Sequence, residues 1–379
     1  MAIKTIRKLG GLGNIGPWFA ALLVSTCAAL FWNPAATAQT TYSITDLGTQ
    51  PGATCVASAI NDNGEVVGHC SSGSFNEVAF VWRNGVMTSL GKLPRANYSQ
   101  AHAINSQGVV VGEGDTGDFR PHPTLYRNGT VIDIDASGGN ARAIYINDNG
   151  IIVGDYSKGF GNASSWSAVI WTEEATKPGR FRRISLEPYP GGDSKSRYGY
   201  ATGANQDIQV VGWVQNSLFG QMGAFWNNDA NHTLSLLEPV PGDWTSIAWG
   251  MNDFGQAVGE SHPPFGSRPV LWDNDGAHTP VELPLLPGDN YGSAGAINNR
   301  GHILGSSAYG TQGTWNVGPR RLVIWRDGGV FELQSLLDPL TGDGWTLTSA
   351  SAINDLGQIV GNGLHNGQPA AFLMSPVIP

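Results

Sequence analysis

Three carboxylates of this chain stand where acid–base chemistry could be done. Glu113, Asp155 and Glu260 each follow a glycine that ends a short apolar run, in the segments VVGE, IVGD and AVGE. A carbohydrate-active hydrolase or lyase needs two carboxyl groups in one cleft, one protonated and one ionised, at a separation set by its mechanism. The three residues are therefore the catalytic candidates, and their separation is what a structure has to supply.

The sequence contains no other catalytic or metal-binding motif. It has neither a G-x-S-x-G nucleophile elbow nor an H-E-x-x-H zinc helix. Four further acids each lie in a turn with one carboxylate, without the alternating oxygen ligands of a calcium loop. These acids are Asp62, Asp148, Asp253 and Asp355. The sequence therefore predicts neither a bound metal nor a cofactor.

A ten-residue phrase that recurs seven times must position these residues. The copies are AINDNGEVVG (59–68), AINSQGVVVG (103–112), YINDNGIIVG (145–154), GANQDIQVVG (203–212), GMNDFGQAVG (250–259), AINNRGHILG (296–305) and AINDLGQIVG (352–361). Their asparagines are 42 to 58 residues apart. Internal periods of this size are typical of solenoids, propellers and arrays, and these gaps suit a blade of several strands.

Each copy predicts a β-hairpin. The asparagine closes the first strand with an Asx-type turn, the first glycine supplies a positive φ, and the closing glycine indicates a bend or a close backbone approach. The expected residues are Asn61, Gly64, Gly68, Asn105, Gly108, Gly112, Asn147, Gly150, Gly154, Asn252, Gly255, Gly259, Asn298, Gly301, Gly305, Asn354, Gly357 and Gly361. The fourth copy has Asp207 and Ile208 where the first glycine should fall, so its turn is expected to differ.

A second hairpin completes each unit and predicts an all-β, seven-bladed propeller of four-stranded antiparallel blades. Runs such as AFVWRNG (79–85) carry a central aromatic residue and a two-residue turn signal. The Val and Ile runs are apolar at consecutive positions, as expected where neighbouring sheets cover both faces. An open β-solenoid is the alternative, but its coils are usually shorter than these repeats.

The two ends of the repeat region fit each other. The seventh copy ends after AAFLM (370–374) without a fourth strand, whereas YSITDLG (42–48) resembles a fourth strand that precedes the first copy. We therefore expect the N-terminal strand to complete the last blade and close the ring within one domain, residues 39–379. Trp82, Trp226 and Trp272, the aromatic residues of three such blades, are expected in the core.

The first 38 residues predict a secretory signal peptide. Basic residues precede the apolar run 18–32, and Ala36, Thr37 and Ala38 form a small-residue cleavage site. Cleavage would leave 18 basic and 30 acidic residues, a net charge of −12. We expect a secreted, extracellular or periplasmic monomer without stable membrane insertion, and the acidic charge argues against nucleic acid as a partner.

The two cysteines outside the leader are predicted to form a disulfide. Cys55 and Cys70 are equidistant from the Asn61–Gly64 turn, so hairpin pairing sets them opposite each other. An exported protein meets an oxidising compartment, which favours the bond.

The repeats resemble the HAF-repeat family of probable extracellular bacterial proteins. The resemblance rests on A-I-N-x-x-G-x-x-V-G followed by A-F-x-W, N-G and L-G, and it covers nearly all of residues 42–374. The His-Ala-Phe tripeptide is degenerate here, as in Val78-Ala79-Phe80. The resemblance implies an extracellular repeat domain and brings no agreed reaction or catalytic residues.

The loops between the second and third strands, and those between blades, vary most in length and share one face. Variable loops on a rigid scaffold commonly carry function. They include the predicted ligand-binding residues Trp166, Trp244 and Trp315. We expect a non-enzymatic module that binds an extracellular carbohydrate or protein ligand, and the alternative is a carbohydrate-active hydrolase or lyase that uses the carboxylates at the propeller mouth.

Overall fold

The computed structural model describes residues 40–73, 76–158, 166–190, 198–215, 220–311, 313–314 and 316–377. The expected signal peptide, residues 1–38, and the candidate residue Trp315 lie outside these ranges. No helix within the described ranges is long and apolar enough to cross a membrane.

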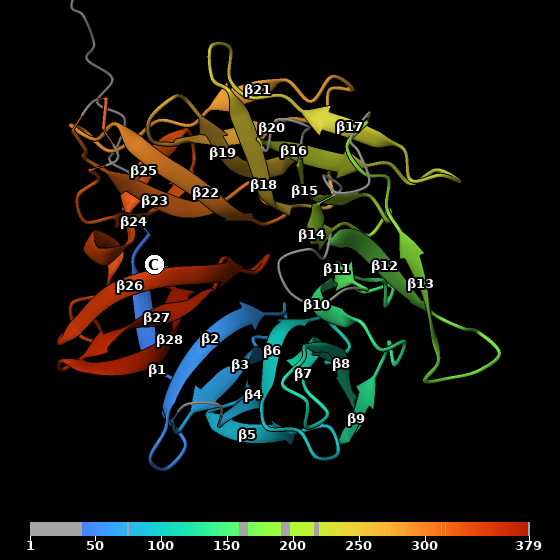
Figure 1. Ribbon diagram of the computed structural model, residues 1–379. Coiled ribbons are helices and arrows are strands. Elements are labelled where there is room, and N and C mark those ends of the chain that lie inside the picture. The colour runs from blue at the N-terminus through green and yellow to red at the C-terminus, as the bar shows by residue number, and fades with distance from the viewer. Residues whose placement is uncertain are drawn as a thin grey trace, which may run out of the picture. The chain divides into compact units, whose positions relative to one another are not determined.

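The described residues form a ring of seven four-stranded antiparallel sheets, as the repeats predict (Figure 1). We number the sheets as blades 1 to 7 in the order of the repeats. In each blade the first strand of the hairpin phrase lies innermost, because residues of these seven strands line the central channel.

The first four blades have these strands. Blade 1 contains β2 (Thr54–Ile60), β3 (Val66–Ser71), β4 (Glu77–Arg83) and β5 (Val86–Gly91). Blade 2 contains β6 (Ser99–Ile104), β7 (Val110–Gly114), β8 (His122–Arg127) and β9 (Thr130–Asp133). Blade 3 contains β10 (Asn140–Ile146), β11 (Ile152–Ser157), β12 (Ser167–Glu173) and β13 (Phe181–Ser185). Blade 4 contains β14 (Gly199–Ala204), β15 (Val210–Gln215), β16 (Gln221–Trp226) and β17 (Leu234–Leu237).

The remaining blades complete the ring. Blade 5 contains β18 (Thr245–Met251), β19 (Ala257–His262), β20 (Arg268–Trp272) and β21 (Pro280–Glu282). Blade 6 contains β22 (Tyr291–Ile297), β23 (Ile303–Ala308), β24 (Arg321–Arg326) and β25 (Gly329–Glu332), which the 3-10 helix η2 (Leu333–Leu336) follows. Blade 7 contains β26 (Trp345–Ile353), β27 (Ile359–His365), β28 (Gln368–Pro376) and β1 (Tyr42–Asp46).

The closing glycine of every copy lies opposite a bulge in the inner strand. In blade 1, Gly68 pairs with Ala57 and the register then shifts by one residue. A Cβ atom on Gly68 would lie 1.9 Å from the carbonyl oxygen of Val56, and the other six closing glycines meet a backbone oxygen at 1.9 to 2.0 Å. Only glycine allows this close approach of two strands, which explains why all seven copies keep it.

The turn after each asparagine is uniform, and the prediction of a different fourth turn is wrong. The first glycine has a φ of 75° to 80° in six blades, and Ile208 takes the same place in blade 4 with a φ of 60°. Ile208 N donates to Asn205 O at 3.2 Å, as Gly64 N donates to Asn61 O at 3.0 Å. The ring therefore imposes one turn geometry even on a β-branched residue that disfavours it.

The asparagine side chains connect neighbouring blades, a role that the sequence did not reveal. Each Nδ2 donates to the backbone oxygen of the next asparagine at 2.8 to 3.3 Å in six of the seven joints. These bonds are Asn61 to Asn105, Asn105 to Asn147, Asn147 to Asn205, Asn252 to Asn298, Asn298 to Asn354 and Asn354 to Asn61. In blade 4, Asn205 Nδ2 donates to Gln209 Oε1 instead.

The third-strand aromatic residues lie in the core, and four of their indoles also join blades. Trp82, Trp226 and Trp272 are buried, as expected. Trp226 Nε1 donates to Glu187 O and Trp272 Nε1 to Glu238 O, both at 2.8 Å, in the connector from the preceding blade. The indoles of Trp171 and Trp325 also donate to preceding connectors. These side chains therefore combine apolar burial with a satisfied N–H donor.

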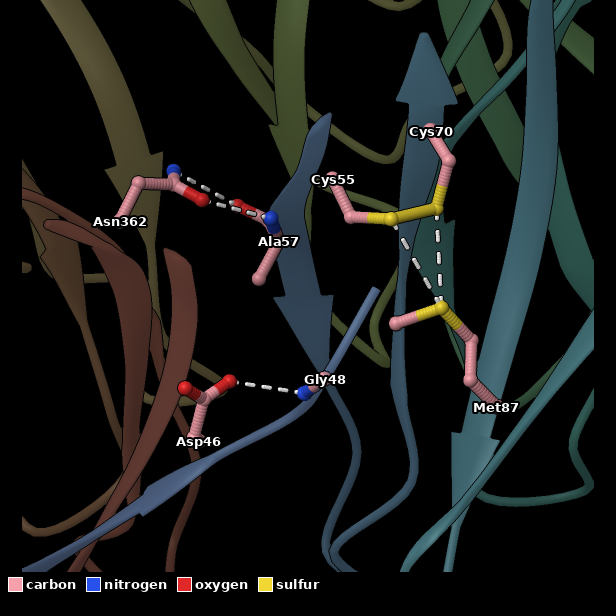
Figure 2. Close-up of a disulfide and its surroundings, with 7 residues drawn as sticks. All are labelled: Asp46, Gly48, Cys55, Ala57, Cys70, Met87 and Asn362. Carbon is pink, nitrogen blue, oxygen red and sulfur yellow. Dashed lines mark hydrogen bonds between the residues drawn. A yellow bond between two sulfur atoms is a disulfide. The ribbon is translucent and has the colours of Figure 1, made fainter. Parts of the chain in front are cut away.

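The N-terminal strand closes the ring, which confirms the expected circular closure. β1 pairs antiparallel with β28, from Tyr42 opposite Pro376 to Asp46 opposite Phe372. The joint between blades 7 and 1 is visible in Figure 2, where Ala57 N donates to Asn362 Oδ1 at 2.8 Å. Because β1 covers the outer edge of β28, the last blade has four strands like the others.

Cys55 and Cys70 are directly opposite each other in the first hairpin and form a disulfide (Figure 2). The sulfur of Met87, from the outermost strand of the same blade, lies 3.8 Å from the Cys55 sulfur and 3.6 Å from the Cys70 sulfur. The bond joins the two inner strands of blade 1 across a sequence separation of 15 residues.

We expect the substitution Ile44→Asp to destabilise the closed ring. Ile44 is buried at the centre of β1, whereas its neighbour Thr45 is exposed on the same strand. A carboxylate at position 44 would lose its hydration without gaining a partner, so the free energy of unfolding should fall by about 2–4 kcal/mol. Thr45→Asp, the matched control, should change it by less than about 0.5 kcal/mol in guanidinium melts. Equal effects of the two variants would contradict closure through β1.

Replacing both cysteines by serine should lower the free energy of unfolding by about 3 kcal/mol, the value expected for a loop of this length. Wild-type protein that has been fully reduced should lose the same amount, because both changes release the same cross-link. Thiol titration of denatured, unreduced protein that comprises residues 39–379 should find neither thiol free. Detection of two free thiols would disprove the bond.

Candidate functional site

The inner strands surround a channel that contains two adjoining cavities. One, of about 300 Å³, is lined by the ring of asparagines and the turn residues that follow them. The other, which we call the chamber, has a volume of about 260 Å³. Six side chains line both cavities and therefore lie between them: Ile60, Ile104, Tyr145, Met251, Ile297 and Ile353.

The bulged residue of every inner strand lines the chamber. These residues are Ser58, His102, Ile144, Thr202, Trp249, Gly295 and Ser351. Three of them bond to the carbonyl before the next bulge: His102 Nδ1 lies 3.1 Å from Ala143 O, Thr202 Oγ1 donates to Ala248 O, and Ser351 Oγ donates to Ala57 O. The bulge therefore turns a side chain toward the channel and joins two blades at the same level.

Three neighbouring blades carry charged and aromatic side chains in the layer above the chamber, away from the asparagines. This layer consists of the residue after each closing glycine and its partner on the inner strand. In blades 2, 3 and 4 the pairs are Gln100 with Glu113, Arg142 with Asp155, and Tyr200 with Trp213. Trp166 precedes β12 and stacks on Tyr200. We call Glu113, Arg142, Asp155, Trp166, Tyr200 and Trp213 the mouth cluster.

Asp155 is fully engaged by Arg142. Arg142 Nε donates to Asp155 Oδ1 at 3.1 Å and Nη2 donates to Oδ2 at 2.7 Å. Burial raises the pKa of Asp155, whose side chain is almost inaccessible, and the Arg142 guanidinium counteracts this effect. A buried carboxylate with both oxygens bonded to a guanidinium orients that guanidinium. It is not placed to attack a substrate or to accept its proton.

The carboxyl group of Glu113 has a raised pKa. Burial raises its pKa to about 7, the positive charge of Arg142 lowers it, and the negative charge of Glu77 raises it. Its Oε2 atom is buried and has no hydrogen-bond partner among the described residues. At neutral pH this carboxyl group therefore exchanges between a neutral donor and an anion.

Glu260 belongs to a different set of contacts. It accepts a hydrogen bond from Trp249 Nε1 at 3.1 Å, and its other oxygen lies 3.0 Å from His262 Nε2. Glu113 and Asp155, in contrast, both interact with Arg142. The structure thus joins two of the three candidate carboxylates through an arginine and gives the third partners in blade 5.

Three aromatic rings stack beside this arginine. The Tyr200 ring centroid lies 4.4 Å from that of Trp213 and 6.2 Å from that of Trp166, with interplanar angles of 22° and 23°. The Arg142 guanidinium carbon lies 5.1 Å from the Trp166 centroid and 5.9 Å from that of Tyr200. Cation–π attraction and stacking therefore hold the aromatic rings against the charged part of the cluster.

The three predicted tryptophans have different positions. Trp166, in the loop before β12, contacts the mouth cluster as described. Trp244, in the connector before β18, is 69% exposed, and nothing in the described structure places it in the cluster. Trp315 lies outside the described residues. Arg142, Tyr200 and Trp213 are not among the residues predicted from the sequence. The hairpin pairing that relates the two cysteines places Arg142 opposite Asp155 and Tyr200 opposite Trp213, the residues that follow two closing glycines.

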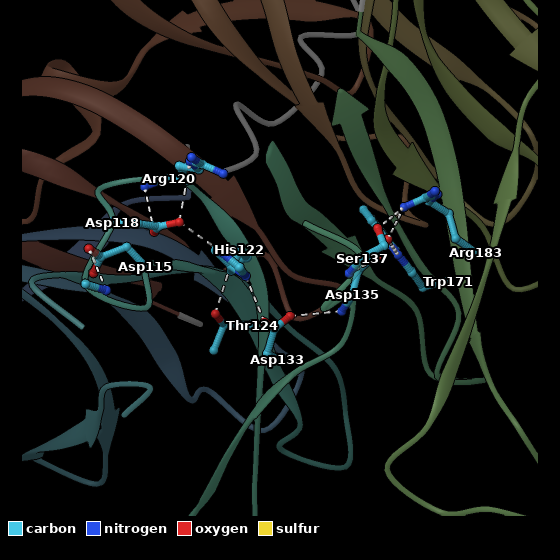
Figure 3. A network of polar contacts seen from close by, with 11 residues as sticks. Asp115, Asp118, Arg120, His122, Thr124, Asp133, Asp135, Ser137, Trp171 and Arg183 are labelled. Atoms are coloured by element: carbon cyan, nitrogen blue, oxygen red, sulfur yellow. Dashed lines mark hydrogen bonds and ion pairs between the residues drawn. The ribbon is translucent and has the colours of Figure 1, made fainter. Parts of the chain in front are cut away.

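A polar network holds the loops of blade 2 (Figure 3). Asp115 is buried, and although burial raises its pKa, hydrogen bonds from Asn97, Phe119 and Tyr98 outweigh that effect and lower it. His122 Nδ1 lies 2.8 Å from Asp133 Oδ2, and this contact raises the pKa of the imidazole. The carboxylates of this network are used to fix loops. No group of three or more His, Cys, Asp or Glu residues in the described ranges is arranged to hold a metal ion.

Comparisons with known proteins identify the fold and no family. The chain matches no protein-family profile, and no curated protein matches it. It is similar to the β-propeller domain of the Trilobed protease from Pyrococcus furiosus, with 8% identity over 86% of this chain and 94% of that chain and a TM-score of 0.52.

Two peptidases have the same TM-score. The Pyrococcus horikoshii acylaminoacyl peptidase is 11% identical over 86% of this chain. A puromycin-hydrolyzing peptidase of Mycobacterium tuberculosis is 12% identical over 89% of this chain. This chain spans 52% and 54% of their lengths, so the similarity concerns about half of each peptidase and shows the fold alone.

Glu113→Gln should remove a fall in stability near neutral pH. Because folding raises the pKa of Glu113 from 4.5 to about 7, the unfolded chain releases this proton at lower pH than the folded chain does. The free energy of unfolding therefore decreases between those two pH values, by up to about 3 kcal/mol, and is constant above them. Guanidinium melts at about pH 5 and about pH 8 should show this decrease in wild-type protein and not in the Glu113→Gln variant. The exposed Glu282 offers the control, since Glu282→Gln should keep the decrease.

Proposed function

We propose that this chain is a secreted, non-enzymatic binding module whose ligand is a carbohydrate held at the mouth cluster. The observation that carries the proposal is the stack of Trp166, Tyr200 and Trp213 beside Arg142 and Glu113. Aromatic faces pack against the C–H faces of a sugar ring, and a few placed polar groups orient its hydroxyls. The cluster offers both kinds of contact within three adjacent blades.

The hydrogen bonds between Arg142 and Asp155 support a binding function over a catalytic one. Hydrolysis of a glycosidic bond needs a second carboxyl group that acts as a nucleophile or base opposite the acid. Glu113 suits the acid, but both oxygens of Asp155 accept hydrogen bonds from Arg142. The raised pKa of Glu113 remains the one observation in favour of a carbohydrate-active hydrolase or lyase, which we keep as the second candidate.

Secretion is supported by the leader and by the disulfide. In residues 1–38, basic residues, an apolar run and a small-residue cleavage site follow one another in the order typical of a signal peptide. The Cys55–Cys70 bond suits an oxidising compartment. The resemblance to HAF-repeat proteins supports the same location.

A glycan and polysaccharide screen of the mature protein, which records both binding and product release, distinguishes the binding module from the hydrolase or lyase. We expect binding without products. Alanine at Trp166 should weaken the binding at least tenfold, because it removes one end of the aromatic stack, and it should leave the melting temperature nearly unchanged. Alanine at the exposed Trp244 tests whether the binding surface extends over the neighbouring loops.

Alanine at the buried Trp226 is the structural control. It should lower the free energy of unfolding by about 3–5 kcal/mol, because it leaves a large cavity in the core. Product release that Glu113→Gln abolishes would favour the hydrolase or lyase. Unchanged glycan affinity in the Trp166→Ala variant would show that the ligand binds elsewhere.

A further inference from the structure

We propose that the chamber of the central channel is a second binding site, which takes one uncharged sugar ring or a polyol of similar size. The chamber lies between the asparagine-lined cavity and the layer that carries the mouth cluster. Its volume of about 260 Å³ is below the range of about 300–1,000 Å³ that drug-sized ligands occupy, so it suits a single ring.

Trp249 gives the chamber an aromatic wall. It is the bulged residue of β18, where the other blades place Ser, His, Ile, Thr or Gly. The indole is 38% exposed although it comes from an innermost strand. Its only N–H donates to Glu260 Oε1, and His262 contacts the other oxygen of that carboxylate. The indole is therefore held at its N–H edge, and Trp249 lines the chamber, where it can serve as an aromatic platform for a sugar.

The Nε2 atom of His102 gives the chamber a hydrogen-bond acceptor to which a ligand hydroxyl can donate. Its Nδ1 lies 3.1 Å from the carbonyl oxygen of Ala143, which can only accept, so Nδ1 carries the proton. Burial lowers the pKa of His102, which leaves Nε2 as a bare acceptor. This Nε2 lies 3.4 Å from Gln100 Oε1, a second acceptor, whose amide orientation is fixed because Gln100 Nε2 donates to Glu77. A ligand hydroxyl can donate its one hydrogen to His102 Nε2, and a second ligand hydroxyl can donate to Gln100 Oε1.

The lining also disfavours charged ligands. None of the described residues around the chamber is Asp, Glu, Lys or Arg, and the wall toward the asparagines consists of isoleucines, Met251 and Tyr145. A charged ligand would lose its hydration there without a counter-charge. The chamber therefore favours a neutral ligand that combines apolar C–H surface with hydroxyl groups.

Ligand-detected saturation-transfer NMR and calorimetry of the mature protein test the proposal with glucose, galactose, mannose, xylose and myo-inositol at millimolar concentration, and with glucuronate as the charged counterpart. At least one neutral probe should bind, and glucuronate should bind more weakly. Trp249→Ala and His102→Phe should each reduce the affinity at least tenfold, because they remove the platform and the acceptor respectively.

Gly295→Leu is an independent variant that blocks the chamber. Gly295 lines it, has no positive φ, and a Cβ there would have no heavy atom closer than 4.0 Å. A leucine should therefore fill the space and abolish binding while the melting temperature stays unchanged. Trp244→Ala, which removes an exposed tryptophan in the connector before β18, should leave neutral-sugar binding intact.

The outcomes separate this site from the mouth cluster. Binding that survives Gly295→Leu, or that Trp166→Ala alone abolishes, would place the sugar outside the chamber and overturn the proposal. Absence of binding by every neutral probe would overturn it as well. Glycan binding at the mouth cluster would be unaffected by either result.

Discussion

The ring depends on the repeated asparagine, whose side-chain amide makes hydrogen bonds both within its own turn and to the next blade. Within blade 1, the Asn61 Oδ1 accepts hydrogen bonds from the N–H groups of Asn63 and Glu65 and so shapes the turn. Across the joint, Asn61 Nδ2 donates to Asn105 O at 2.9 Å. Aspartate has no N–H donor and serine is shorter, so neither side chain can do both. Loss of either function would leave a buried polar group without a partner, at a cost of about 1–3 kcal/mol.

The closing glycine and the bulge divide each hairpin into a constant part and a free part. Below the bulge, the asparagine bonds and the turns fix residue type and geometry in almost every blade. Above it, the residue after the glycine differs in type from blade to blade. Blade 6 pairs Ser293 with Ser306 there, whereas blade 3 pairs Arg142 with Asp155. Chemical diversity in this layer therefore leaves the asparagine bonds and the turns below the bulge unchanged.

The sequence predicts the architecture well because the repeat states the same constraint seven times. The number of blades, the strand order within them and the closure by residues 42–48 follow from the repeats and from one missing strand. The sequence wrongly predicts a different turn at Ile208, because isoleucine disfavours a positive φ locally, whereas the neighbouring blades impose the same geometry. The linking role of the asparagines was missed for the same reason, since a bond from Asn61 to Asn105 is a property of two repeats and not of one.

The candidate site was predicted less well. The position after a glycine identifies Glu113 and Asp155. The sequence does not show that Arg142 donates hydrogen bonds to both oxygens of Asp155 or that its charge lowers the pKa of Glu113. Trp166 was chosen because it lies in a long loop, whereas its partners Tyr200 and Trp213 lie within strands. These residues come together only when three successive blades pack against one another, and the pattern of a single repeat does not place them side by side.

Closure by the N-terminal strand also determines the order in which the domain is completed. β1 is the first strand of the chain to be made, and its partner β28 is the last, about 330 residues later. Until β28 is made, the apolar residues Tyr42 and Ile44 have no partner strand, and the six blades already made cannot form a closed circle. Joining such distant segments carries a large loop-closure entropy, which grows with the logarithm of the separation. Until its two ends meet, the chain therefore leaves β1 and the outer edge of the last blade unpaired, and such edges are open to pairing with other chains.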